Sequence, residues 1–224
     1  MNTLKLITAL TAGLALTACG QAPLETASRN APAPLPSDAA GTLTQEARSQ
    51  AETASYDVVD VRVTVPRTLE VSEANRFYPG GDIVWREDPP GDRHAQVRKI
   101  VEDAMRKGAR ASGAGDVPVV LDVEVTRFHA LTEKARYTVG GVHALQFNMQ
   151  LRDAETGAPL GEPHFVKADF KALGGQAAVR AEQAGLTQKK RITDHLANVI
   201  RTELTSPGGY RAANLGLMGA LNQL

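Results

Sequence analysis

The sequence predicts an α+β fold in which a four-stranded, mostly antiparallel sheet carries two helices on one face, as a two-layer sandwich. Four segments alternate apolar and polar residues, which is the pattern of half-buried strands, and two segments repeat apolar residues at helical spacing. The elements follow one another as β-α-β-β-β-α. Because two such layers bury every apolar face at once, we expect a single domain over residues 56–205.

The first strand is expected at residues 59–65, where valines alternate with polar residues, and Pro66 ends it. One face of this strand would carry Val59, Val61, Val63 and Val65. A short extended piece follows at Asp82–Trp85. The segment Asp88–Asp92 contains two prolines and a glycine, so it cannot continue a strand, and Asp92 is the expected N-cap of a helix.

The first helix is expected from Asp92 to Arg110. Lys107, Gly108 and Arg110 supply the charges and the stop that are typical of a last turn. The apolar stripe that would face the sheet consists of Val97, Ile100, Val101, Ala104 and Met105.

Three further strands complete the predicted sheet. Residues 119–126 alternate, and a change of phase at Arg127–Phe128 predicts a bulge or the end of that strand. After a turn or kink at Gly140-Gly141, the next strand has as its inward residues Leu145, Phe147, Met149 and Leu151. A hairpin loop at Asp153–Gly157 then leads into a fourth strand at Phe165–Phe170.

The second helix is closed by Pro207-Gly208-Gly209, and its helically spaced apolar residues are Ile192, Leu196, Val199, Ile200 and Leu204. Its start is open between Thr187 and a position near Gln176. The basic triplet Lys189-Lys190-Arg191 in a first turn would oppose the helix dipole, which favours the longer helix. Residues 206–224 form an apolar tail that either packs on the domain or awaits a partner.

Residues 1–18 have the pattern of a signal peptide, because Lys5 precedes an uncharged run that is too short to span a membrane. The stretch Leu16-Thr17-Ala18-Cys19 resembles the bacterial lipobox. This resemblance implies cleavage before Cys19, a diacylglyceryl thioether on its sulfur and acylation of its amino group, which would keep the protein on a membrane. Gly20 stands where inner-membrane lipoproteins of many Gram-negative bacteria have aspartate, so we expect the periplasmic face of the outer membrane.

Residues 19–55 are expected to be a disordered tether. Residues 20–55 contain no aromatic residue, valine or isoleucine and cannot build a core, and a coil of this length has dimensions of about 30–40 Å. With Cys19 bonded to lipid, the domain has no cysteine for a disulfide, a nucleophile or a metal site. The 25 basic and 25 acidic residues are interspersed, which argues against nucleic acid as a partner.

The densest polar cluster of the sequence comprises Asp82, Glu87, Asp88, Asp92 and His94. Carboxylates and imidazole are the groups that general acid–base catalysis or a hard metal ion needs. The structural interpretation, which we favour, makes Asp92 a helix cap, places Asp88 in a loop before two prolines, and leaves Glu87 and His94 exposed to solvent.

Trp85 has two interpretations. Within an Ile-Val-Trp run it fits a core aromatic residue, which we favour. An exposed tryptophan beside Pro89 and Pro90 would instead be a good anchor for a protein interface.

The histidines indicate no zinc site, because no i,i+4 pair and no His-Glu-x-x-His pattern occurs among His94, His129, His143, His164 and His195. His129 and Glu133 could join Arg127, Lys134 and Arg136 in a charged patch, although a solvated loop is the simpler interpretation. The sequence has neither a phosphate loop nor a Gly-x-Ser-x-Gly nucleophile motif. We therefore expect no catalytic residue, metal or cofactor.

Two segments, Asp82–Arg93 and Val123–Glu133, resemble an uncharacterised family of proteobacterial lipoproteins. The resemblance implies a shared domain and no catalytic residue. With its lipobox and element order, the chain also resembles small periplasmic accessory lipoproteins: the lipopolysaccharide-assembly lipoprotein, auxiliary lipoproteins of ABC-type lipid transporters, and lipoproteins related to curli export.

Three functions fit these observations. The first is a non-enzymatic outer-membrane lipoprotein that serves as an accessory or assembly subunit and binds another envelope protein. The second is a periplasmic carrier of lipid or a small molecule, with an apolar slot between sheet and helices. The third is a hydrolase with its site between Asp82 and His94. We favour the first, because binding through a protein surface requires no motif.

Overall fold

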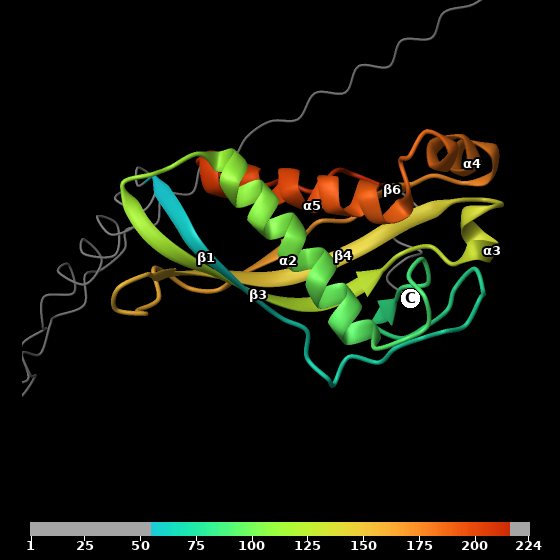
Figure 1. Cartoon of the computed structure of the whole chain (residues 1–224), viewed down its shortest axis with the longest axis horizontal. Helices are drawn as coiled ribbons and strands as arrows, with labels where there is room; N and C mark the ends of the chain where they lie inside the picture. The colour runs from blue at the N-terminus through green and yellow to red at the C-terminus, as the bar shows by residue number, and fades with distance from the viewer. Residues whose placement is uncertain (1–54, 216–224) are drawn as a thin grey trace, which may run out of the picture. The chain divides into compact units, whose positions relative to one another are not determined.

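The computed structural model describes residues 55–215 of the 224-residue chain (Figure 1). The expected signal peptide, Cys19 and the tether up to residue 54 lie outside the described residues, as do residues 216–224 of the tail. The elements are β1 (Tyr56–Thr64), β2 (Ile83–Val84), α2 (Arg93–Ser112), β3 (Val117–His129), α3 (Glu133–Arg136), β4 (Gly141–Asp153), β5 (His164–Lys167), β6 (Phe170–Ala172), α4 (Gly175–Gln183) and α5 (Gln188–Thr205).

The strands form one sheet in which β1, β3, β4 and β5 are neighbours in that order. β1 and β3 are parallel, whereas β3 with β4 and β4 with β5 are antiparallel. β2 pairs with the end of β3 on the β1 side, and β6 pairs with the start of β4 on the β5 side. The six strands therefore occupy four positions across the sheet. The α+β class is confirmed, and the predicted count of four strands is wrong.

Each edge of the sheet is interrupted for its own reason. The chain leaves the first edge after β1 as a long loop and returns at β2. On the second edge the buried Asp169 separates β5 from β6, because its carboxylate accepts the N–H of Leu145 at 3.0 Å where a backbone carbonyl would otherwise be. The continuous strand predicted at Phe165–Phe170 is therefore split in two.

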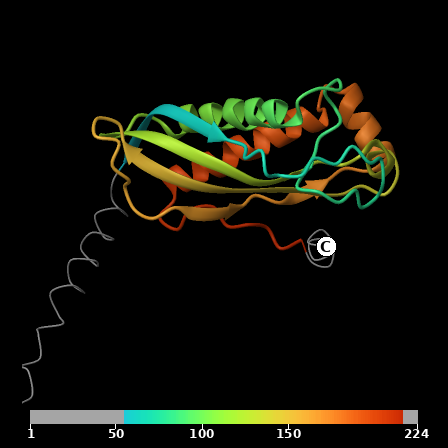
Figure 2. The ribbon, with the colours of Figure 1, turned by 90° about the horizontal axis from the view of Figure 1, so that it is seen from below.

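The long helices α2 and α5 lie on one face of the sheet, as two views show (Figures 1 and 2). Asp92 is the N-cap of α2, as predicted, and accepts the N–H of Ala95 at 3.1 Å. The helices approach closely at Gly108, where an added Cβ would lie 2.1 Å from Cγ2 of Ile200 and 2.2 Å from the carbonyl oxygen of Ala197. Fully buried side chains fill the layer between helices and sheet, among them Val97, Ile100, Met105, Leu121, Leu145, Ile192 and Leu196.

The start of the second long helix differs from the prediction. α5 begins at Gln188 with Thr187 as its N-cap, so the favoured longer helix is wrong. A separate helix, α4, ends at Gln183, and Gly185 between the two helices has a φ of +76°, which helical residues do not adopt. With α3, the described fold therefore has two short helices in addition to the two that were predicted.

The bulges of the sheet were predicted in one strand and missed in another. The register of β3 against β4 shifts between Val125 and Arg127, which confirms the predicted bulge. The register of β1 also shifts, between Val58 and Asp60, so Val59 is 55% exposed and Val58 packs against the core in its place. The prediction that four valines share one face is therefore wrong at Val59.

After α5 the chain turns back, and Tyr210 packs on the core with its ring edge-on to that of His195, at 6.1 Å between centroids. The described part of the predicted tail thus contacts the domain through Tyr210. None of the helices within residues 55–215 has the length and apolar character that crossing a membrane requires.

Candidate functional site

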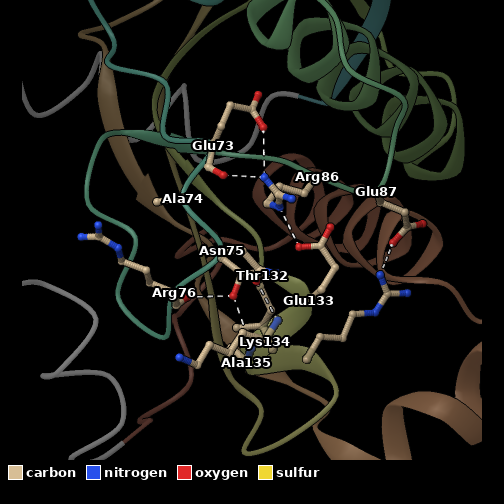
Figure 3. Close-up of polar contacts among 12 residues, drawn as sticks. Glu73, Ala74, Asn75, Arg76, Arg86, Glu87, Thr132, Glu133, Lys134 and Ala135 are labelled. Carbon is tan, nitrogen blue, oxygen red and sulfur yellow. Dashed lines mark hydrogen bonds and ion pairs between the residues drawn. The ribbon is translucent and has the colours of Figure 1, made fainter.

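A network of ion pairs surrounds the short helix α3 (Figure 3), which lies at one end of the sheet (Figure 1). Three segments meet there: residues 72–79 of the loop before β2, residues 133–139 with α3, and residues 175–186 with α4. We call these three segments the α3 end. Residues 85–88, which follow β2, contact these segments and supply most of their ion-pair partners.

Arg86 connects two of these segments. Its Nε donates to the Glu133 carboxylate at 2.6 Å, and its Nη1 donates to the main-chain oxygen and the carboxylate of Glu73. The buried Arg93 also donates to Glu73, from Nε at 2.6 Å. Burial would raise the pKa of the Glu133 carboxyl, but the hydrogen bond and charge of Arg86 outweigh it and hold that pKa below its ordinary value.

Arg136 connects α3 with the helices that follow. It is 9% exposed, its Nη1 lies 3.1 Å from the Glu87 carboxylate, and its Nη2 pairs with Glu182 of α4. The Glu87 carboxylate also accepts the N–H of Lys189 in the first turn of α5, at 3.1 and 3.2 Å. Glu87 thus places a negative charge at the positive end of the α5 dipole.

Asp88 completes the neutralisation of the first turn of α5. Its carboxylate accepts from the Lys189 ammonium at 2.9 Å and from Nε1 of Trp85 at 2.8 Å. Burial would raise the pKa of Asp88, but these two hydrogen bonds and the charges of Lys189 and Arg93 lower it overall. α5 begins at Gln188 despite its basic first turn, because Glu87 and Asp88 of another segment balance that charge.

A cleft of about 340 Å³ opens between these charged side chains, lined by Arg86, Glu87, Leu131, Glu133, Arg136, Tyr137, Glu182, Thr187 and Gln188. A narrow recess beside it reaches the buried His143 and shares Arg136, Glu182 and Gln188 with the cleft. Burial, followed by the charges of Arg191 and Arg136, lowers the pKa of His143 to about 3, so its ring is neutral near pH 7. Within the described residues its Nδ1 has no hydrogen-bond partner.

The surface of the α3 end is unusually apolar for this protein. Five of the nine large apolar side chains that are exposed in residues 55–215 lie on it: Phe77, Tyr78, Tyr137, Val139 and Leu186. The Lys134 ammonium lies over the Phe77 ring, 4.8 Å from its centroid, and the Tyr137 hydroxyl donates to Glu182 at 3.2 Å. The segments that the ion pairs join therefore also carry the exposed aromatic and aliphatic side chains.

The predicted polar cluster does not converge on one point. Glu87 and Asp88 join the network, whereas Asp82 accepts the N–H of Glu70 at 2.9 Å and Asp92 caps α2. A hydrogen bond from Arg67, then the one from the Ala95 N–H, lower the pKa of Asp92 to about 2. Solvent exposure of Glu87 and His94 was predicted wrongly, since their side chains are 18% and 14% exposed. His94 is turned to the carbonyl oxygen of Leu69, at 3.1 Å.

Trp85 belongs to the core, as favoured. It is completely buried and meets Phe128 edge-on, at 5.8 Å between ring centroids. The alternative in which Trp85 is an exposed interface anchor is therefore wrong, although its neighbours Pro89 and Pro90 lie on the surface.

The solvated loop predicted around His129 is also wrong. His129 is 6% exposed, and its Nε2 lies 2.7 Å from the carbonyl oxygen of Gly81. Burial, then the charge of Arg127, lowers the pKa of His129 to about 4. Glu133 and Arg136 do form a charged cluster, but with partners that sequence reasoning missed: Glu73, Arg86, Glu87 and Glu182. No local pattern identifies these partners, because each pair joins distant segments.

Ion pairs and burial set the protonation states at this end of the fold. Asp88 and Glu133 have lowered pKa values and stay ionised near pH 7, whereas a general acid needs a raised one. His129 and His143 are held neutral and buried. No group of three histidine, cysteine or acidic residues that could hold a metal ion occurs within the described part of the chain.

Comparison with known proteins places the chain in a family. A family model described as "Family of unknown function (DUF6778)" matches residues 56–220. Two solved structures show a distant likeness: a candidate lipoprotein from Caulobacter crescentus CB15 and a single-substitution variant of the PelC dodecamer from Paraburkholderia phytofirmans. The first has 13% identity and a TM-score of 0.33, with 73% of this chain and 99% of the other covered. The second has 18% identity and a TM-score of 0.30, with 71% and 92% covered. No curated protein matches the chain.

Proposed function

The chain belongs to the family of unknown function DUF6778, and from this premise we propose that it is a non-enzymatic lipoprotein of the outer membrane whose periplasmic domain docks on another envelope protein as an accessory or assembly subunit. The lipobox-like stretch that ends in Cys19 supports the anchor. The surface of the α3 end supports the docking role.

The docking role is supported mainly by the exposed aromatic side chains of the α3 end, whose segments are held together by ion pairs. Tyr78 and Tyr137 are 70% and 47% exposed. Tyrosine and arginine are enriched among the residues that dominate protein interfaces. Because ion pairs already fix the segments that carry these rings, a partner would meet a surface that needs little ordering, which favours affinity.

The place where the chain enters the fold supports the same proposal. Ser55 accepts main-chain hydrogen bonds from Asp116 and Val117 at the start of β3. This point lies at the opposite end of the sheet from α3 (Figure 1). A tether that joins the domain there leaves the α3 end free to meet a protein in the periplasm.

Photocrosslinking in cells tests the docking role. The full-length chain would carry a photoreactive amino acid in place of Tyr78, and a matched chain would carry it in place of Arg98 on the exposed side of α2. We expect a discrete protein adduct from position 78 that is absent from position 98. Equal adducts from both positions, or none from any position of the α3 end, would contradict the proposal.

The anchor has its own test, which compares the natural chain with Cys19→Ala. We expect the natural protein in the outer-membrane fraction and the variant outside that fraction, with partner recovery reduced in the variant. A Cys19→Ala protein that still sediments with the outer membrane would contradict lipid anchoring.

A further inference from the structure

We infer that the partner contacts the α3 end through an acidic protein segment, whose carboxylates meet Arg76 and Lys134 beside the exposed aromatic rings. This inference rests on the proposed function and names the chemistry of its partner. The inference follows from a difference between the charged residues of the α3 end: its acidic residues form ion pairs, whereas most of its basic residues do not.

Every carboxylate of the α3 end forms an ion pair. The three segments contain three acidic residues, and each is paired with arginine: Glu73 with Arg86 and Arg93, Glu133 with Arg86, and Glu182 with Arg136. These carboxylates therefore contribute little net negative potential to the surface.

Most of the basic residues of the α3 end, in contrast, form no ion pair within residues 55–215. Of its four basic residues only Arg136 forms an ion pair, whereas Arg76, Lys134 and Arg180 have no acidic partner among residues 55–215. All three are exposed to solvent. The uncompensated charge of this surface is therefore positive, although the whole chain has a formal net charge of +0.

Two of these cations are held close together on one scaffold. The main-chain oxygen of Arg76 accepts from the Thr132 hydroxyl at 2.8 Å, and the Asn75 side chain accepts the N–H of Lys134 at 2.9 Å. Figure 3 shows the side chains of Arg76 and Lys134 extending to the same side, away from the Arg86–Glu133 pair. Phe77 places an apolar ring under the Lys134 ammonium and follows Arg76 directly in the chain.

Such a surface matches a segment in which aspartate or glutamate flanks apolar side chains. Apolar contacts would exclude water from the rim, and a charge pair that is desolvated in this way contributes more than one in open solvent. The surface of an anionic bilayer is also negatively charged and could meet the same two cations. A protein is favoured because the α3 end lies at the end of the sheet opposite the point where the chain enters the fold (Figure 1).

The test uses the full-length chain with the photoreactive residue at position 78 and adds one charge reversal at a time. The variants are Arg76→Glu and Lys134→Glu, and the matched control is Arg98→Glu on α2. A loss of about 1 kcal/mol for one pair corresponds to about a fivefold drop in binding, so we expect adduct yield to fall about fivefold or more in both variants and to stay unchanged in the control. Thermal unfolding that stays within about 2 °C of the parent confirms that the variants fold.

Mass spectrometry of the adduct identifies the partner peptide. We expect it to contain at least two acidic residues, and we expect a lysine replacing one of them to restore the yield with Lys134→Glu. A peptide without acidic residues, an adduct with lipid, or yields that ignore both reversals would overturn this inference. In the first and third cases the proposed function still stands, whereas it falls with the inference if no protein is crosslinked from any position of the α3 end.

Discussion

Arg86 donates from Nε to the Glu133 carboxylate at 2.6 Å, and this contact joins residues 47 positions apart. The two residues come from the two segments through which the chain resembles an uncharacterised lipoprotein family. Those segments also meet where β2 pairs with Phe128 and His129 of β3, and where Trp85 packs against Phe128. The motif therefore describes one structural unit, which places α3 against the sheet.

The first prediction concerns this contact. Replacing Arg86 with methionine leaves the carboxylates of Glu73 and Glu133 with fewer partners, at side-chain exposures of 52% and 39%. Because solvent screens these groups in part, we expect a loss of about 1–2 kcal/mol in the free energy of unfolding, measured in urea. Glu133→Gln in the Arg86→Met background should then cost less than it does alone. Additive effects of the two changes would refute the coupling.

The second prediction concerns the start of α5. Glu87→Gln keeps the shape of the side chain but removes the negative charge from the helix N-terminus and from Arg136. We expect a loss of about 1–2 kcal/mol in unfolding free energy. Glu155→Gln, in the exposed hairpin loop, is the matched control and should change stability little. Equal effects of the two substitutions would show that Glu87 does not stabilise the helix.

The third prediction concerns the contact between α2 and α5. In Gly108→Ala the new methyl group would lie 2.2 Å from the Ala197 carbonyl oxygen, so the helices must move apart. Overpacking costs about 1–3 kcal/mol and should outweigh the gain of about 1 kcal/mol in helix propensity. Urea unfolding would then show Gly108→Ala to be less stable than the parent. A variant at least as stable as the parent would mean that α2 and α5 are farther apart than described.

The fourth prediction concerns pH. The folded protein holds the pKa of His129 at about 4, below the unfolded value of 6.5, so the unfolded chain takes up the proton first as the pH falls. Neutral, buried His129 therefore contributes fully to the free energy of unfolding above about pH 6.5. This stabilisation is lost as the pH falls from 6.5 to 4, and the total loss is at most about 3 kcal/mol.

Urea unfolding at several pH values between 7.5 and 4 would measure this effect. The slope should be shallower in His129→Gln than in the parent protein. Identical slopes in the parent and His129→Gln would contradict the burial of His129.

Sequence reasoning succeeded where the structure depends on neighbours along the chain. Asp92 was identified as a cap from its place before a helical stripe, and the bulge in β3 from a change of phase at Arg127. It failed where distant segments decide the outcome. The basic first turn of α5 is balanced by Glu87, and the turned-in Asp169 splits a strand that reads as continuous.

The candidate site shows the same division. Glu133 and Arg136 were recognised as charged residues of one short stretch, but their partners Arg86 and Glu182 lie in other segments. His129 was interpreted as solvated because it lies in a loop-like stretch, Phe128–Tyr137, whereas the fold buries it against the carbonyl oxygen of Gly81. Periodicity shows which face of an element is apolar, and it does not show which distant element covers that face.

The most direct test of the central claim, that the α3 end is a docking surface, removes its exposed rings. The full-length double variant Tyr78→Ala and Tyr137→Ala would carry the photoreactive residue in place of Leu186, and Phe165→Ala, an exposed ring on β5, is the matched control. We expect the yield of the partner adduct in cells to fall about tenfold or more in the double variant and to stay at the parent level in the control. An undiminished adduct from a folded double variant would contradict the claim.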